Sequence, residues 1–129
     1  MRKLLLVAIL SAMFGENVTQ EQLDKGNKKC LAGEFRTCGT LGELYQYGIF
    51  GVAQDFAKAA AYYRLTCEAG VRLGCHNFAI YSFNQNDKQS AKEYFKKACD
   101  LGKDDPATQN TPDNKARWQK ACDMHEVLR

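Results

Sequence analysis

The chain has 129 residues, six cysteines, two prolines and a formal net charge of +3. This length suits one ordinary domain, and 45% apolar with 26% charged residues is typical of a globular chain. Two prolines exclude a collagen-like or proline-rich linker protein. The small charge, with no Lys/Arg cluster interleaved with aromatic residues, argues against a nucleic-acid partner.

The first fifteen residues follow the order of a secretory signal peptide. A basic start, Met1-Arg2-Lys3, precedes the apolar run Leu4 to Leu10, and small residues then lead to Gly15. The alternative is a membrane anchor or a buried helix, but the apolar stretch ends by Phe14, short of the roughly 20 residues that cross a bilayer. We therefore expect a signal peptide over 1–15, one mature domain over 16–129, and a secreted or periplasmic protein without membrane contact.

The first two predicted helices lie over about 39–48 and from Asp55 to Gly70. Asp55 is placed to cap the second helix, and Gly70 to end it. Two glycines within Gly48-Ile49-Phe50-Gly51 predict a turn between the two helices. The apolar face of the first consists of Leu41, Leu44, Tyr45 and Gly48, and that of the second of Phe56, Ala59, Ala60, Tyr63 and Cys67.

Three further helices are predicted in the second half of the chain. One runs over about 74–83, and the next begins after Asp87 and ends at Gly102. Residues 104–113 hold both prolines and are predicted to be irregular. A last helix, roughly 113–127, would turn Trp118, Ala121 and Leu128 inward. No segment has a strand pattern, so the predicted fold class is all-α, a short α/α solenoid of stacked helix hairpins.

The cysteines recur with a regular spacing. Seven residues separate Cys30 from Cys38, and seven also separate Cys67 from Cys75, at an offset of 67 − 30 = 37 positions. A third copy of the pattern starts at Cys99, and Ala121-Cys122-Asp123 is a fourth fragment. A repeat of this length is typical of stacked helical units.

The sequence resembles a known repeat family. The pattern is Leu41-Gly42-x-Leu44-Tyr45-xx-Gly48-xx-Gly51-Val52-xx-Asp55-xx-Lys58-Ala59-xx-Tyr62-Tyr63. It resembles the Sel1-like repeat, a relative of the tetratricopeptide repeat, and the likeness extends over about 25–127. With Cys67 and Cys75 added, it is similar to the Helicobacter cysteine-rich protein family. In that family a disulfide joins the end of one helix to the start of the next.

Six cysteines allow fifteen pairings, and the resemblance selects among them. It implies the bridges Cys30–Cys38 and Cys67–Cys75. In the third repeat Ala107 stands where the second cysteine is expected, which leaves Cys99–Cys122 as the third pair.

Metal binding is the competing interpretation of the cysteines. Zinc ligands usually have two to four intervening residues, and the only histidines are His76 and His125. Redox catalysis would need a C-x-x-C motif, which the sequence lacks. We therefore expect no metal and no cofactor.

The favoured functional hypothesis is a monomeric interaction module. It would bind a peptide or protein on the concave surface that the first helix of each repeat lines. The alternative is that these positions merely face solvent. The candidate binding residues of that concave surface are Thr40, Glu43, Tyr47, Asn77, Ile80 and Asn84.

A second hypothesis comes from the resemblance, which implies penicillin binding with weak β-lactamase activity. The partner would then be a β-lactam or a peptidoglycan-like small molecule. An S-x-x-K nucleophile motif is absent, because none of Ser11, Ser82 and Ser90 has a lysine three residues on. The resemblance therefore assigns no catalytic residue.

Overall fold

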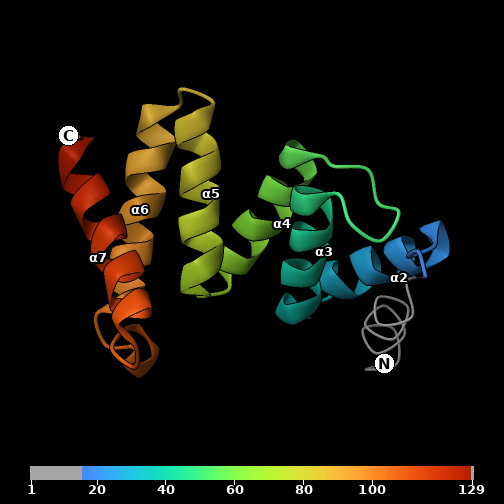
Figure 1. The fold of residues 1–129 in the computed structure, drawn as a ribbon, viewed down its shortest axis with the longest axis horizontal. Helices are drawn as coiled ribbons and strands as arrows, with labels where there is room; N and C mark the ends of the chain where they lie inside the picture. The colour runs from blue at the N-terminus through green and yellow to red at the C-terminus, as the bar shows by residue number, and fades with distance from the viewer. Residues whose placement is uncertain (1–15, 129) are drawn as a thin grey trace. The chain divides into compact units, whose positions relative to one another are not determined.

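The computed structural model describes residues 16–128, so the expected signal peptide, 1–15, lies outside the described residues. The described part of the chain is helical and contains no strand (Figure 1), which confirms the all-α prediction. Contacts divide it into two compact units, one ending at Tyr62 and the other beginning at Tyr63. The elements are α2 (Gln20–Leu31), α3 (Phe35–Tyr47), α4 (Phe56–Glu68), α5 (Arg72–Asn84), α6 (Lys88–Gly102), the 3₁₀ helix η1 (Pro106–Thr108) and α7 (Pro112–Val127).

Helix α2 opens the first unit and was not predicted from the sequence. A capping box starts it: Thr19 Oγ1 accepts from the Gln22 N–H (3.2 Å), and Gln22 Oε1 accepts from the Thr19 N–H (2.9 Å). Gly26 on α2 faces Leu41 on α3, and a Cβ built on Gly26 would lie 3.4 Å from Leu41 Cδ2. Few apolar residues occur in α2, which explains why the periodicity did not reveal this helix.

The rest of the first unit follows the predicted turn and caps. Helix α3 begins at Phe35, four residues earlier than expected, and ends at Tyr47. Gly48 caps it in a left-handed conformation (φ 59°) that favours glycine. Asp55 donates its N–H to the Tyr45 carbonyl (2.8 Å), and Asp55 Oδ1 accepts from the Lys58 N–H (3.0 Å). The loop is thereby tied to α3 at the residue that caps α4.

Tyr62 links α4 back to the other two helices of the first unit. Its hydroxyl donates to Asn27 Oδ1 on α2 (2.8 Å), and its ring stacks on Tyr45 of α3 with the centroids 6.0 Å apart. Burial, and secondarily Tyr45, raises the pKa of the Tyr62 hydroxyl. It therefore stays protonated and keeps donating at neutral pH.

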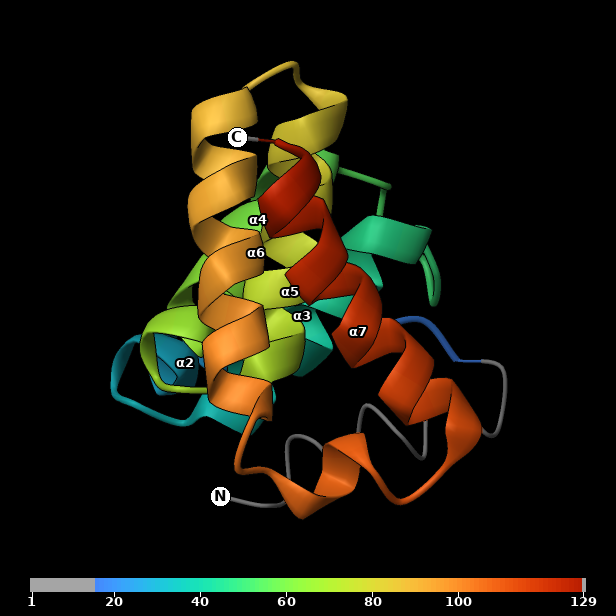
Figure 2. The ribbon, with the colours of Figure 1, turned by 90° about the vertical axis from the view of Figure 1, so that its left-hand side faces the viewer.

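In the second unit, α6 packs against both α5 and α7 (Figure 2). Small side chains at the contacts let the helices approach closely. Phe78 of α5 meets Tyr94 of α6 edge to face, with centroids 4.4 Å apart. Asp87 caps α6 as predicted, its Oδ1 accepting from the Ser90 N–H (3.1 Å). The buried core consists of Cys67, Cys75, Ala79, Ala91, Tyr94, Phe95, Ala98 and Ala121.

All three predicted disulfides are present. Cys30–Cys38 joins α2 to α3, Cys67–Cys75 joins α4 to α5, and Cys99–Cys122 joins α6 to α7. No described cysteine is free. Cys122 lies inside α7, as expected, rather than at its start.

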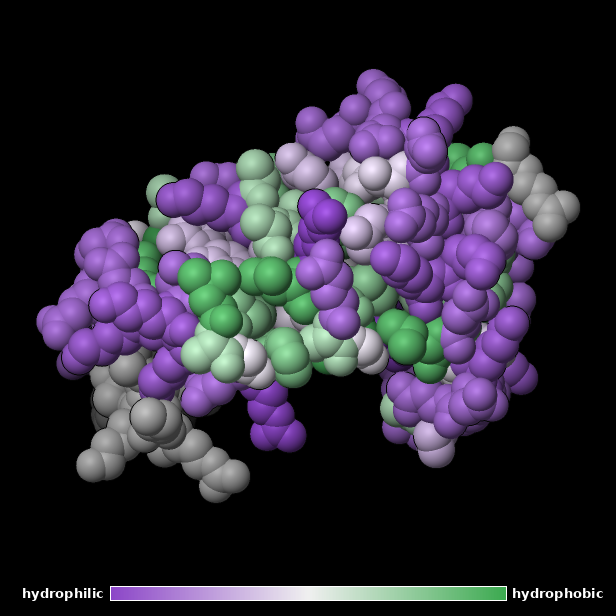
Figure 3. Space-filling model, turned by 180° about the vertical axis from the view of Figure 1, so that it is seen from behind, coloured by the Kyte–Doolittle hydropathy of each residue, from purple (hydrophilic) through white to green (hydrophobic). Residues whose placement is uncertain are grey.

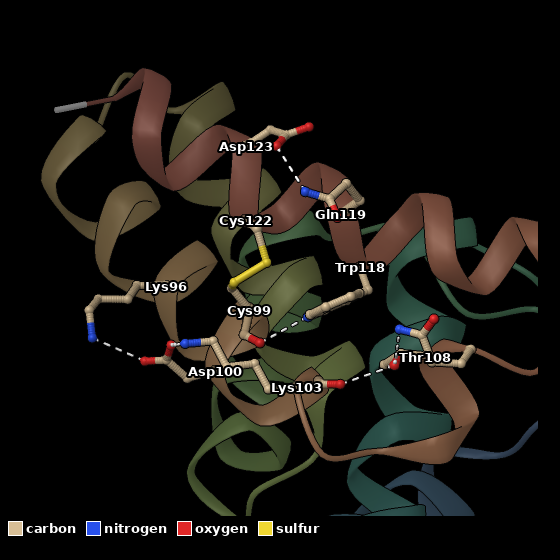
Figure 4. The surroundings of a disulfide bond; sticks show 11 residues. Lys96, Cys99, Asp100, Lys103, Thr108, Trp118, Gln119, Cys122 and Asp123 are labelled. Carbon is tan, nitrogen blue, oxygen red and sulfur yellow. Dashed lines mark hydrogen bonds and ion pairs between the residues drawn. A yellow bond between two sulfur atoms is a disulfide. The ribbon is translucent and has the colours of Figure 1, made fainter.

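The segment between α6 and α7 is less irregular than predicted, because η1 forms at Pro106. Thr108 of η1 is fully buried, and its Oγ1 lies 3.0 Å from the Gly102 carbonyl oxygen and 2.8 Å from that of Asp105. Trp118 of α7 donates its indole N–H to the Cys99 carbonyl (2.9 Å; Figure 4). These bonds anchor the connection beside the disulfide.

Two residues of the predicted apolar faces were placed wrongly. Gly48 is exposed, because it caps the end of α3 instead of packing within the helix. Phe56 is 55% exposed, whereas Ala59, Ala60 and Tyr63 are buried as expected. Phe56 is the first residue of α4, so its side chain stands at the end of the apolar stripe. Among the predicted inward residues of the last helix, Ala121 is buried, and Trp118 and Leu128 are half-buried.

Candidate functional surfaces

In the first unit, three of the six candidate binding residues share one side of α3. Thr40, Glu43 and Tyr47 follow a spacing of three and four residues, which aligns them along the helix. Tyr47 is 62% exposed, and Glu43 is also exposed. The half-buried Thr40 donates its hydroxyl to the Arg36 carbonyl (3.0 Å), so its polar atom is already engaged. Of the three candidates on α3, Glu43 and Tyr47 are therefore the ones available for contact.

In the second unit, Asn77, Ile80 and Asn84 lie along one side of α5. Ile80 is 41% exposed, Asn84 is exposed and Asn77 is half-buried. The structure adds Leu73, which precedes Asn77 by one helical turn and is 47% exposed. Apolar side chains reach the surface among polar ones on one face of the molecule (Figure 3). An exposed stripe that alternates apolar and amide groups suits an extended peptide.

The sequence did not reveal a group of basic side chains that the second unit brings together. His76 of α5 is half-buried, and burial lowers the pKa of its imidazole, as do the charges of Arg72, Lys120 and Arg117, in that order. Arg72 is on α5, and Arg117 and Lys120 are on α7. We call these four residues the α5–α7 basic cluster. Forty-five positions separate Arg72 from Arg117 (117 − 72), and no local pattern in the sequence joins them.

The structure describes the surroundings of Ser82 and of the possible metal ligands. Ser82 is buried and donates its hydroxyl to the Phe78 carbonyl of its own helix (3.0 Å), and Ser11 lies outside the described residues. Over residues 16–128, no group of three His, Cys, Asp or Glu side chains is placed to hold a metal ion. No helix in the same range is both long and apolar enough to cross a membrane.

Successive helix hairpins joined by disulfides define a class, the all-α helical-repeat proteins. The model of the Sel1 repeat matches this chain over residues 40–71 and 83–103. The first match includes most of α3 and all of α4, and the second includes α6. The chain therefore contains Sel1-like repeats over these two stretches. Sel1 repeats generally mediate protein–protein interaction, whereas the likeness to the Helicobacter cysteine-rich family stays a prediction.

A curated relative is the Cytochrome c oxidase assembly factor 7 homolog of Drosophila melanogaster. It is 32% identical over 76 residues, which cover 53% of this chain and 27% of the relative. The match thus spans about a quarter of the relative's length. No solved structure matches the chain.

Proposed function

We propose that this chain is an exported interaction module whose first-helix faces bind a peptide or protein partner. The observation that carries the proposal is the exposed stripe on α5, where Leu73 and Ile80 stand in solvent in a chain that contains Sel1-like repeats. On α3 the exposed Tyr47 offers a large aromatic contact of the kind that anchors interfaces. The Drosophila relative is named as an assembly factor, and this name favours a binding role for the present chain too.

Site-specific photo-crosslinking tests the binding face. A benzophenone amino acid would replace Tyr47 or Ile80 in the full chain, and Gln89 in a control. Gln89 is exposed on α6, a second helix of its hairpin. The probes at Tyr47 and Ile80 should each give crosslinked adducts of the chain with its partner, of one defined mass. The Gln89 probe should give none. Adducts of equal yield from all three positions, or from none, would contradict the proposed binding face.

The export part of the proposal draws on the signal-like start and on the three disulfides, which persist in oxidising compartments. Intact-mass analysis of the fractionated source cells tests it. We expect a mature chain that begins at Glu16, is found outside the cytosol and carries three bridges. A reduced chain that still begins at Met1 and stays in the cytosol would contradict export without affecting the binding proposal.

A further inference from the structure

We propose that the α5–α7 basic cluster binds the acidic side chains of a peptide segment, which fixes the chemistry of the partner. The inference rests on the proposed interaction function, because it names what the partner presents to the second unit. It concerns Arg72, His76, Arg117 and Lys120, all of which lie in that unit.

Packing holds the α5 side of the cluster in place. Arg72 and His76 are one turn apart on the same side of α5. The His76 ring stands edge to face on Phe95 of α6, with centroids 5.8 Å apart. A Cβ built on Gly102 would lie 3.0 Å from Arg72 Cδ and would also meet the Trp118 indole. The aliphatic part of Arg72 is thus confined beside Gly102 and Trp118, and its charged end is presented in a limited range of directions.

No ion pair among the described residues involves a side chain of the cluster. These ion pairs involve other side chains, on α2, α4 and α6 or just beyond the end of α6. The three cations that lower the pKa of His76 act together with burial, and no carboxylate contributes to that shift. Arg72 Nε and His76 Nδ1 are shielded from solvent and have no hydrogen-bond partner within residues 16–128. Arg72 Nε is an N–H donor, so it lacks an acceptor of the kind that a carboxylate ligand would supply.

The N-terminus of α5 adds to the positive potential. Its cap residue, Val71, provides no side-chain hydrogen bond, and the first turn holds no acidic residue. By contrast, α6 and α7 are capped by the side chains of Asp87 and Thr111. The positive end of the α5 dipole therefore lacks a carboxylate near Arg72, the first residue of the helix.

Three cations match a segment with several carboxylates better than a single chain terminus, which supplies one negative charge. Arginine binds carboxylates with paired, parallel hydrogen bonds. The exposed Ile80 lies on α5 one helical turn beyond His76, on the same side of the helix. An acidic segment that carries one apolar side chain would therefore contact both kinds of surface.

The probe is a seven-residue peptide of aspartates and glutamates around one leucine, with an acetylated and an amidated end. The chain has a single tryptophan, Trp118, next to Arg117, so its fluorescence can report binding. We expect saturable binding that weakens with salt and falls about tenfold in the double variant Arg72→Gln/Arg117→Gln. The matched control is Lys115→Gln, which removes a positive charge from an exposed position of α7 and should change affinity less than about twofold. Circular dichroism checks that each variant folds.

Three companion ligands make the result specific. The same peptide with asparagine and glutamine should not bind, and a neutral peptide with a free terminal carboxylate should bind much more weakly. A 12-nucleotide single-stranded DNA tests general attraction to polyanions and should also bind weakly. The proposal is overturned if the DNA or the terminal carboxylate binds as tightly as the acidic peptide, or if Lys115→Gln weakens binding as much as the double variant.

Titration of the histidines by NMR gives a second readout. Carboxylates placed beside His76 should raise its pKa, whereas His125 serves as the internal reference and should not shift. An unchanged pKa of His76 at saturating peptide would place the ligand elsewhere and overturn the proposal. The crosslinking experiment keeps the two proposals separate: adducts at Tyr47 or Ile80 without acidic-peptide binding leave the interaction function standing and reject only the acidic partner.

Discussion

The α4–α5 and α6–α7 junctions of the second unit hold their two helices together in different ways. Each is closed by a disulfide, with Cα–Cα distances of 4.4 Å at Cys67–Cys75 and 4.8 Å at Cys99–Cys122. The first bridge spans 8 positions of sequence and the second spans 23. The bridge geometry is thus similar, but the length of chain that it closes is not.

At the α4–α5 junction the backbones themselves meet. Val71 donates its N–H to the Thr66 carbonyl (3.0 Å), and a Cβ built on Gly74 would lie 2.7 Å from both the Cys67 nitrogen and the Tyr63 carbonyl oxygen. At the α6–α7 junction the side chains of Thr108 and Trp118 hold the connection in place by hydrogen bonds to backbone carbonyls. When the second cysteine moves from the start of a helix into its interior, other side chains must anchor the longer connection.

The largest expected effect is the loss of the longer bridge. On the chain-entropy model, removing Cys99–Cys122 lowers the free energy of unfolding by about 3.5 kcal/mol, and removing Cys67–Cys75 lowers it by about 2.5 kcal/mol. Urea unfolding of the double variants Cys99→Ala/Cys122→Ala and Cys67→Ala/Cys75→Ala measures both. Under reducing conditions the variants and the parent should converge, because the bridges are then absent throughout. A larger loss for the shorter bridge would mean that packing of the buried Cys67 and Cys75 outweighs loop closure.

A smaller effect should come from the close approach of the backbones at α4–α5. We expect Gly74→Ala to destabilise the protein by about 2–3 kcal/mol, because the new methyl group would collide with Thr66 Oγ1 and with backbone atoms that cannot move aside. The control is Gly39→Ala within α3, where a Cβ would meet nothing within 4 Å. That change should stabilise by about 0.5–1 kcal/mol through helix propensity. Equal effects at the two glycines in thermal unfolding would contradict the tight junction.

The same contrast explains how far the sequence predicts the fold. The α4–α5 junction repeats a local pattern of helix cap, apolar stripe, glycine and cysteine, so its helices and bridge follow from short-range chemistry. Helix α2 escaped prediction because its stability comes from a polar capping box and from packing of Gly26 on Leu41. Phe56 was misplaced because periodicity assigns a face but not where the neighbouring helix ends.

The candidate surfaces also differ in how far the sequence predicts them. Glu43, Tyr47, Ile80 and Asn84 are exposed, as the helical spacing indicates, but their role in binding is not set by exposure. The α5–α7 basic cluster depends on the rotation of α7, which η1 and the Trp118 bond set through a connection with no repeat pattern. The sequence therefore does not predict which charged residues of α5 and α7 lie close together.

The smallest expected effect isolates the side-chain anchor of the α6–α7 junction. Trp118→Phe keeps an aromatic ring but removes the donor to the Cys99 carbonyl, and it should cost about 1 kcal/mol. The matched variant is Thr66→Val at the other junction, which removes the bond from the Thr66 hydroxyl to the Tyr63 carbonyl of the same helix. We expect it to cost about half as much, because that hydroxyl ties no second helix. Urea unfolding followed by circular dichroism compares the two. If Thr66→Val is the more costly change, the Trp118 bond anchors the α6–α7 junction less than its geometry indicates.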